Sequence, residues 1–279
     1  MIRIGVSDHK NSIWQGEYTL SELKRFGVEG ELVVIKASKD LGNANTKMLE
    51  GALSRGEIDV AVHSLQDLST VQPTGLVITA VSQRDNAADC LLIRREAFAG
   101  REIFKLKKEA VVAASGLQRN AQLLDIRPDI QFKQFPGDAS DQLEILLSGE
   151  SDAIFTSISV LHRLNISLPE LEIVELNPRE FMPAPAQGVI AWQCNVDDLA
   201  TRRIFKNLHH PEVSACTSVE RRVLQILGEA CPLGVYCERD AVGNYHSFAA
   251  CEIDGELRRA QLSSSTNFGV AEKIAQRLQ

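Results

Sequence analysis

Short apolar runs alternate along the chain with stretches in which apolar residues recur every three or four positions. The runs have the length of buried strands, whereas the wider spacing is typical of one face of a helix. Over the first 82 residues this pattern predicts strands at 3–6, 32–35, 58–63 and 76–81 and helices at 12–26 and 46–55. The rhythm indicates an α/β unit with helices on the faces of a mixed or parallel sheet.

The alternation resumes after a polar break at residues 83–86. The second part is predicted to hold strands at 89–94, 109–114, 130–135, 153–156 and 171–176 and helices at 115–124, 141–147 and 160–164. Residues 181–193 combine prolines and a glycine with an apolar run, which predicts a linker that returns a strand to the first unit. The remaining chain predicts helices at 197–207, 213–228 and 270–278 and strands at 247–253 and 257–262.

Composition narrows the class of protein. The 279 residues are 44% hydrophobic and 24% charged, which is ordinary for a globular chain of two or three domains. No apolar run reaches the roughly 18 residues of a membrane span, and the N-terminus resembles a strand more than a signal peptide, so we expect a cytoplasmic protein. The net charge of −7 argues against a nucleic-acid partner.

The six cysteines lack the C-x-x-C spacing of a metal site. We therefore expect neither zinc nor a disulfide framework, and reduced thiols throughout. No other cluster in the sequence predicts a metal.

Asp67 is the first candidate for chemistry, because it follows the strand predicted at 58–63. Open α/β sheets bind their ligands at the ends of such strands. The alternative interpretation is that Asp67 caps a helix or stabilises a turn.

A second candidate begins at Ser115, where a strand is predicted to lead into a helix. Backbone N–H groups at a helix start favour anions, and Arg119 adds a side chain that can grip a carboxylate with two hydrogen bonds. An exposed arginine at a surface helix is the alternative.

Seven segments resemble, in the same order along the chain, the motifs of the hydroxymethylbilane synthase (porphobilinogen deaminase) family. Residues 62–70 resemble V-H-S-[LM]-K-D-[LV]-P, and residues 115–123 resemble S-S-L-R-R-x-A-Q-L. Residues 182–191 resemble P-A-P-G-Q-G-A-L-A, a hinge strand between domains, with Ala186 in place of a glycine. The other four segments are residues 3–16, 135–143, 152–164 and 219–234.

The resemblance implies a fold of three domains. The first two are expected to be similar to type II periplasmic binding proteins, with a cleft between them, and the third to be a small C-terminal α+β domain. The expected boundaries are 1–82 with 186–200 for domain 1, 86–180 for domain 2 and 204–279 for domain 3.

The resemblance also implies a transferase of tetrapyrrole biosynthesis that joins four porphobilinogen units and releases ammonia at each step. Asp67 matches the catalytic acid/base of the family, and Cys231 matches the cysteine that carries a dipyrromethane cofactor through a thioether. Ser115, Arg119 and Arg163 match residues that hold this cofactor. We expect a monomer whose substrate is porphobilinogen or a less anionic relative.

The chain departs from the family where the family is cationic. Five positions that are normally Arg or Lys are occupied by uncharged residues: Ser7, Gln66, Gln118, Pro136 and Gln142. The mobile segment of the family is cut to about residues 41–47. Because glutamine keeps hydrogen bonding but loses charge, the pattern suits a less anionic ligand, and a non-catalytic small-ligand-binding protein is the alternative function.

Cys231 also allows other interpretations. It lies at the cofactor position when the motif is counted from Glu220, whereas counting back from residues 232–234 places Glu229 there. We favour the first count because loops absorb deletions more easily than helices do. Cys231 could instead be a small buried apolar residue.

Overall fold

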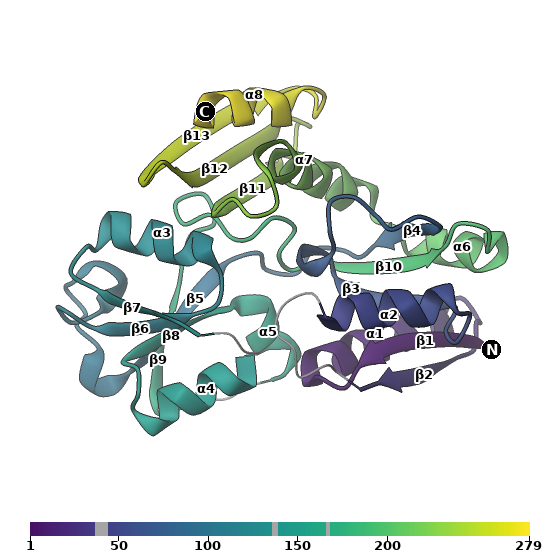
Figure 1. Ribbon diagram of the computed structural model, residues 1–279, viewed down its shortest axis with the longest axis horizontal. Helices are drawn as coiled ribbons and strands as arrows, with labels where there is room; N and C mark the ends of the chain where they lie inside the picture. Colours follow the sequence, from purple (N-terminus) through teal and green to yellow (C-terminus); the bar gives the residue numbers. More distant parts are fainter. Residues whose placement is uncertain (37–43, 136–138, 166–167) are drawn as a thin grey trace. The chain divides into compact units, whose positions relative to one another are not determined.

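The computed structural model describes residues 1–36, 44–135, 139–165 and 168–279, so Pro136 and residues 41–43 lie outside the described part. Contacts divide the chain into two compact units, Met1–Asp85 with Gly188–Ala215 and Asn86–Gln187 with Cys216–Gln279. Three sheets confirm the predicted α/β class with a small additional α+β part (Figure 1). The predicted domain boundaries and the cleft between the first two domains remain predictions.

The first unit is built on a five-stranded sheet in the order β2-β1-β3-β10-β4. Strand β1 runs parallel to β2 and β3, whereas β10 is antiparallel to both β3 and β4. Its elements are β1 (Ile2–Ser7), α1 (Lys10–Arg25), β2 (Gly30–Ile35), α2 (Ala44–Ser54), β3 (Val60–Ser64), β4 (Leu76–Val81), β10 (Ile190–Asn195) and α6 (Leu199–Phe205).

The second unit contains a sheet in the order β7-β6-β8-β5-β9. Its elements are β5 (Asp89–Arg94), β6 (Val111–Ala114), α3 (Leu117–Ile126), β7 (Gln131–Gln134), α4 (Ala139–Ser148), β8 (Ala153–Ser157), α5 (Ile158–Arg163) and β9 (Leu171–Glu175). Strand β5 is antiparallel to β8 and β9, as β10 is to its own neighbours. Both sheets therefore have the same spatial pattern of parallel and antiparallel neighbours, although the antiparallel strand comes last along the chain in the first sheet and first in the second.

In each of these two sheets, one strand is antiparallel to both of its neighbours. This strand is the first that the chain forms after it crosses from the other unit. Strand β5 follows the passage at residues 85–86, and β10 follows the return at residues 187–188. Residues 181–193 were predicted to be a linker that feeds a strand back to the first unit, and this prediction is confirmed.

The second unit also holds a three-stranded antiparallel sheet, β11-β12-β13, with α7 and α8 (Figure 1). The bounds are α7 (Pro211–Leu227), β11 (Leu233–Arg239), β12 (Tyr245–Ile253), β13 (Glu256–Ser264) and α8 (Val270–Leu278). Strand β11 was not predicted, because its pairing with β12, more than its own pattern of apolar residues, makes this segment a strand. No helix in the described ranges is long and apolar enough to cross a membrane.

A buried carboxylate on α7 fixes two other segments of the second unit. Glu220 is inaccessible to solvent, and its two oxygens accept backbone hydrogen bonds from Ala186 (2.6 Å) and Cys237 (2.8 Å). Ala186 has a φ of 65°, in the left-handed region that glycine adopts most easily. This conformation explains why the related motif carries glycine at this position.

We expect Glu220→Gln to lower the free energy of unfolding by about 2 kcal/mol, because one backbone N–H would then face the amide N–H₂ group. Urea unfolding measures the change. Glu252→Gln, at an exposed residue of β12, is the matched control and should change stability little. Equal effects at both positions would contradict a special role for the Glu220 carboxylate.

Candidate functional site

Asp67 ends a short 3₁₀ turn, Leu65–Asp67, that follows β3 directly. Leu65 and Leu68 are buried (2% and 3% exposed), whereas Gln66 and Asp67 between them are exposed. The two leucines thus anchor the turn and leave the carboxylate at the surface. No α-helix begins here, so the helix-cap interpretation of Asp67 is wrong and the turn interpretation describes its backbone.

The environment of Asp67 changes its acidity. Although Asp67 is an exposed residue, neighbouring protein atoms shield its carboxyl group from part of the solvent and raise its pKa to about 6, and a hydrogen bond with the side chain of Gln66 offsets part of this effect. Because the side chain reaches solvent, it can exchange protons with water. A carboxyl group with a pKa near 6 is present in both protonation states near neutral pH, which suits an acid/base catalyst.

The neighbouring His63 has a different role. It is 4% exposed, and burial lowers its pKa to about 4, so the ring is neutral at physiological pH. Ser64, at the end of β3, accepts a hydrogen bond from Gln15 Nε2 (2.8 Å). These two residues belong to the packing of the strand that presents Asp67.

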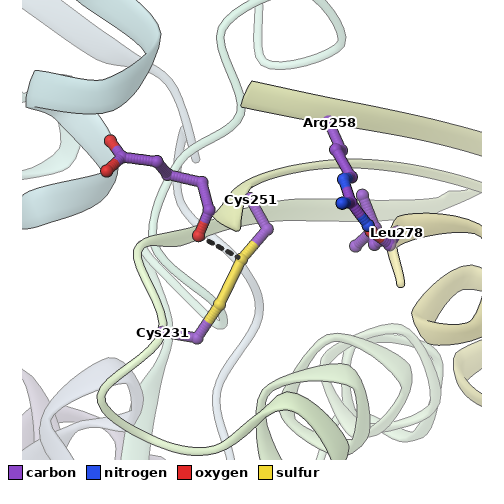
Figure 2. Close-up of a disulfide and its surroundings, with 5 residues drawn as sticks. Cys231, Cys251, Arg258 and Leu278 are labelled. Atoms are coloured by element: carbon purple, nitrogen blue, oxygen red, sulfur yellow. Dashed lines mark hydrogen bonds between the residues drawn. A yellow bond between two sulfur atoms is a disulfide. The ribbon is translucent and has the colours of Figure 1, made fainter. Parts of the chain in front are cut away.

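The structure corrects the prediction that all thiols are reduced. Cys231 and Cys251 form a disulfide between the loop that follows α7 and strand β12 (Figure 2). The two residues are twenty positions apart, and no local spacing signalled the pair. Cys251 is fully buried and Cys231 is half-buried.

The other four cysteines are buried free thiols: Cys90, Cys194, Cys216 and Cys237. Burial raises the pKa of Cys90 to about 12 and that of Cys194 to about 11, so both remain protonated and unreactive. Cys231 is therefore the cysteine with access to solvent. Helix α7 runs unbroken to Leu227, so the count of the motif from Glu220 to Leu227 crosses no loop.

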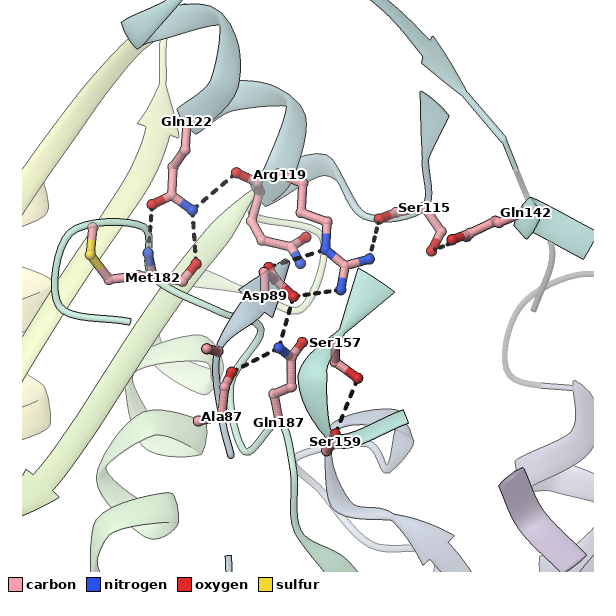
Figure 3. A network of polar contacts seen from close by, with 12 residues as sticks. Ala87, Asp89, Ser115, Arg119, Gln122, Gln142, Ser157, Ser159, Met182 and Gln187 are labelled. Atoms are coloured by element: carbon pink, nitrogen blue, oxygen red, sulfur yellow. Dashed lines mark hydrogen bonds and ion pairs between the residues drawn. The ribbon is translucent and has the colours of Figure 1, made fainter. Parts of the chain in front are cut away.

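Three of the remaining positions meet in the second unit, where β6 leads into α3 (Figure 3). Gly116 adopts a φ of 98° in the turn, which glycine tolerates without strain. The carbonyl oxygen of Ser115 accepts a hydrogen bond from Arg119 Nη1 (3.1 Å), and its hydroxyl accepts one from Gln142 Nε2 (3.0 Å). Gln142, at a cationic position of the related motif, thus contacts a predicted cofactor residue.

Arg119 is a buried member of an ion pair, so the alternative of an exposed surface arginine is wrong. Its Nε and Nη2 donate to the carboxylate of Asp89 at 3.1 Å and 2.7 Å (Figure 3). Burial acts to lower the pKa of Arg119, but the attraction and hydrogen bonds of Asp89 outweigh it and the pKa is raised. The guanidinium therefore remains charged.

Arg163 ends α5 in the same unit and is buried, with 8% of its surface exposed. Gln118 lies half-buried in α3. In the first unit, Ser7 is buried at the end of β1, where its backbone N–H donates to Ser12 Oγ (2.9 Å). Asp67 belongs to the first unit, and Ser115, Arg119, Arg163 and Cys231 belong to the second.

Sequence reasoning missed two residues of this network, Asp89 and Gln187. Gln187 Nε2 donates to Asp89 Oδ1 (2.8 Å) and to the carbonyl of Ala87 (2.8 Å). The available signal was a single carboxylate at the start of a strand whose next four residues are apolar. A charged residue in that context needs a buried partner.

A model of the family described as porphobilinogen deaminase, dipyromethane cofactor binding domain, matches residues 2–203. The porphobilinogen deaminase of Chloroherpeton thalassium is 32% identical over 291 residues, covering 98% of this chain and 90% of the relative. That of Desulforamulus reducens is 33% identical over 286 residues, covering 96% and 90%. The matched region of the family model ends before Cys231.

Among solved structures, an ancestral cationic amino acid solute binding protein matches 82% of this chain and 91% of its own, with 15% identity and a TM-score of 0.48. The fold described above rests on the observed strand orders, not on this superposition.

The raised pKa of Asp67 has a consequence for stability. Between about pH 4 and pH 6 the folded state holds more protons at Asp67 than the unfolded state, so stability falls as the pH rises through this window. We expect Asp67→Asn to raise the free energy of unfolding at pH 7.5 by about 1 kcal/mol, after discounting for exposure to water. At pH 4 the gain should be largely absent.

Urea unfolding of both proteins at both pH values tests this expectation. A gain of equal size at pH 4 and pH 7.5 would show that the carboxyl group is not responsible.

Proposed function

The chain belongs to the porphobilinogen deaminase family, and we propose that it catalyses the reaction of that family. In this reaction four porphobilinogen molecules are joined head to tail into hydroxymethylbilane, and each joining step releases one ammonia. The position and acidity of Asp67 carry the proposal: an exposed carboxyl group at the exit of β3, with a pKa of about 6.

Asp67 can serve two roles in this chemistry, one in proton transfer and one in charge stabilisation. In its acid form the carboxyl group supplies a proton to the departing amino group of porphobilinogen. In its ionised form it stabilises the positive charge that develops on the pyrrole when ammonia leaves. A pKa close to the working pH keeps both forms available.

The dipyrromethane cofactor of the family, when bound, supplies the covalent primer to which pyrrole units are added. A thioether requires the Sγ atom of Cys231, which in this structure is bonded to Cys251. The residues therefore fit the cofactor only when this disulfide is reduced. In the reduced chain, Cys231 would hold the group covalently, and Ser115, Arg119 and Arg163 would bind its polar substituents.

The loss of cationic positions sets the affinity for substrate. A hydrogen bond to a charged group contributes about 1.5–3 kcal/mol. Each replacement of Arg or Lys by an uncharged residue therefore weakens the binding of a substrate carboxylate. Gln142 is engaged with Ser115 instead. We propose porphobilinogen as the substrate, bound more weakly than by a fully cationic site, with a less anionic pyrrole as the alternative.

We further propose a monomer that works in the cytoplasm. Glutathione and thioredoxin keep thiols reduced in that compartment, which favours the form of Cys231 that can accept the cofactor.

The proposal predicts two observations on protein incubated with porphobilinogen and a dithiol reductant. Hydroxymethylbilane should form, and the intact mass under denaturing conditions should increase by two linked pyrrole units. Cys231→Ser should abolish the added mass, and Asp67→Asn should retain it but lower kcat by about 10²–10⁴-fold. The same protein without reductant should show the bare polypeptide mass.

The control is Cys216→Ser, at a buried free thiol, which should retain the added mass. A bare polypeptide mass after full reduction, with no product, would overturn the proposed function.

Restoring charge provides an independent prediction. Gln118→Arg combined with Gln142→Arg should lower the KM for porphobilinogen by about tenfold or more, because two charged hydrogen bonds are added. Initial rates across substrate concentrations measure this change. Gln134→Arg, at an exposed residue of β7, is the control for added net charge, and an equal drop in KM there would refute a local effect.

A further inference from the structure

Asp89 is a fully buried carboxylate that the proposed reaction does not use directly. It is the first residue of β5, with no solvent exposure, and its backbone pairs with Ser157 of β8. Oδ2 accepts from Arg119 Nε, and Oδ1 accepts from both Arg119 Nη2 and Gln187 Nε2 (Figure 3). Three donors on two side chains thus converge on one carboxylate.

We propose that Asp89 is a positioning residue, which holds the guanidinium of Arg119 in the single orientation that receives a substrate carboxylate. The substrate part of this proposal rests on the proposed function. The orientation part rests on the geometry of Figure 3 and can be tested without any substrate.

The donors of Arg119 show what this orientation leaves available. A guanidinium has five N–H groups, and three are used here, two by Asp89 and one by the carbonyl of Ser115. Among the described residues, these contacts leave one N–H on each terminal nitrogen without an acceptor. Two N–H groups on a guanidinium can bind a carboxylate through two parallel hydrogen bonds.

An arginine side chain needs such a support because it has many rotamers. Fixing a long side chain costs up to about 2 kcal/mol of conformational entropy, and the ion pair with Asp89 meets this cost before any ligand binds. Gln187 supports Asp89 in turn, because its amide bridges the carboxylate and the carbonyl of Ala87. The orientation of Arg119 is therefore set by residues beside two points where the chain passes between the units: Asp89, after the passage at 85–86, and Gln187, the last residue before the passage at 187–188.

Asparagine cannot replace Asp89 in this arrangement. If its amide group takes the place of Oδ2, it faces the Nε–H of Arg119, and if it takes the place of Oδ1, it faces Arg119 and Gln187 together. Either way a donor meets a donor, and the paired hydrogen bonds to Arg119 are broken. Asp89→Asn is thus a nearly isosteric test of orientation.

The same helix offers a matched control. At the C-terminal end of α3, Arg127 forms a comparable pair with Asp129, with Nε–Oδ1 and Nη2–Oδ2 distances of 2.7 Å each. The guanidinium of Arg127 also donates to three backbone carbonyls, those of Ile103, Leu106 and Lys107. Its pairing is therefore structural, and Asp129→Asn should affect stability without affecting recognition.

The first experiment uses the ligand-free full chain and requires no turnover. Nitrogen-15 NMR of the arginine side chains should show a protected Nε–H signal for Arg119, assigned by its loss in Arg119→Gln. In Asp89→Asn this signal should shift and exchange with water at least tenfold faster, whereas Asp129→Asn should change only Arg127. An unchanged Arg119 signal in Asp89→Asn would overturn the proposal.

The second experiment measures kinetics with porphobilinogen. Asp89→Asn should raise KM about tenfold while kcat changes less than about twofold, because a misplaced binding group weakens recognition more than chemistry. In an Arg119→Gln background, Asp89→Asn should have no further effect on KM. Additive effects in this cycle, or a similar rise in KM for Asp129→Asn, would overturn the positioning role.

The two experiments separate this inference from the proposed function. The absence of porphobilinogen turnover by the wild-type protein would refute the proposed function. The NMR result would still decide whether Asp89 orients Arg119.

Discussion

The buried carboxylate of Asp89 is the constraint on which the candidate site of the second unit depends. A charge removed from water is tolerated only when its partners are close and its hydrogen bonds are satisfied. Asp89 meets this requirement with Arg119 from α3 and Gln187 from the segment that precedes β10. Three segments far apart in the sequence are thereby held together by one ion pair, and the start of α3 gains a fixed geometry.

Charge is distributed unevenly over the candidate residues. In the second unit, Arg119 is neutralised by Asp89, and Gln142 contacts Ser115 where the related motif carries a cation. In the first unit, Asp67 lies in surroundings that disfavour its ionised form. The chain therefore retains the carboxyl group that we propose as the acid/base, and in the second unit it offers oriented hydrogen-bond donors in place of several net positive charges. Recognition in such a site depends more on direction than on long-range attraction.

Much of the fold followed from the spacing of apolar residues. The bounds of β4, β5 and α8 agree with the predicted ranges, because each has a strong pattern and a clear end. Strand β11 was missed because its partner β12 stabilises it. The shared spatial pattern of the two sheets was also invisible, since strand order depends on pairing between distant segments and not on residue identity.

Among the candidate residues, too, those within a local sequence pattern could be predicted, and those that depend on a distant partner could not. Asp67 could be found because it follows a strand within a recognisable motif. Asp89 and Cys251 could not be found in this way. The partner of Asp89 is Arg119, 30 positions away, and that of Cys251 is Cys231, 20 positions away, and no local pattern reveals either pair. Ion pairs and disulfides join side chains across the fold, so their prediction requires the tertiary structure.

The interrupted first unit imposes an order on biosynthesis. Strand β10 lies between β3 and β4, so the first sheet lacks an interior strand until residues 190–195 have left the ribosome. The sheet of the second unit is contained within residues 89–175 and can close earlier. Nascent chains therefore expose unpaired edges of β3 and β4 while the following unit is already folding. During this interval the unfinished sheet is open to aggregation and to capture by chaperones.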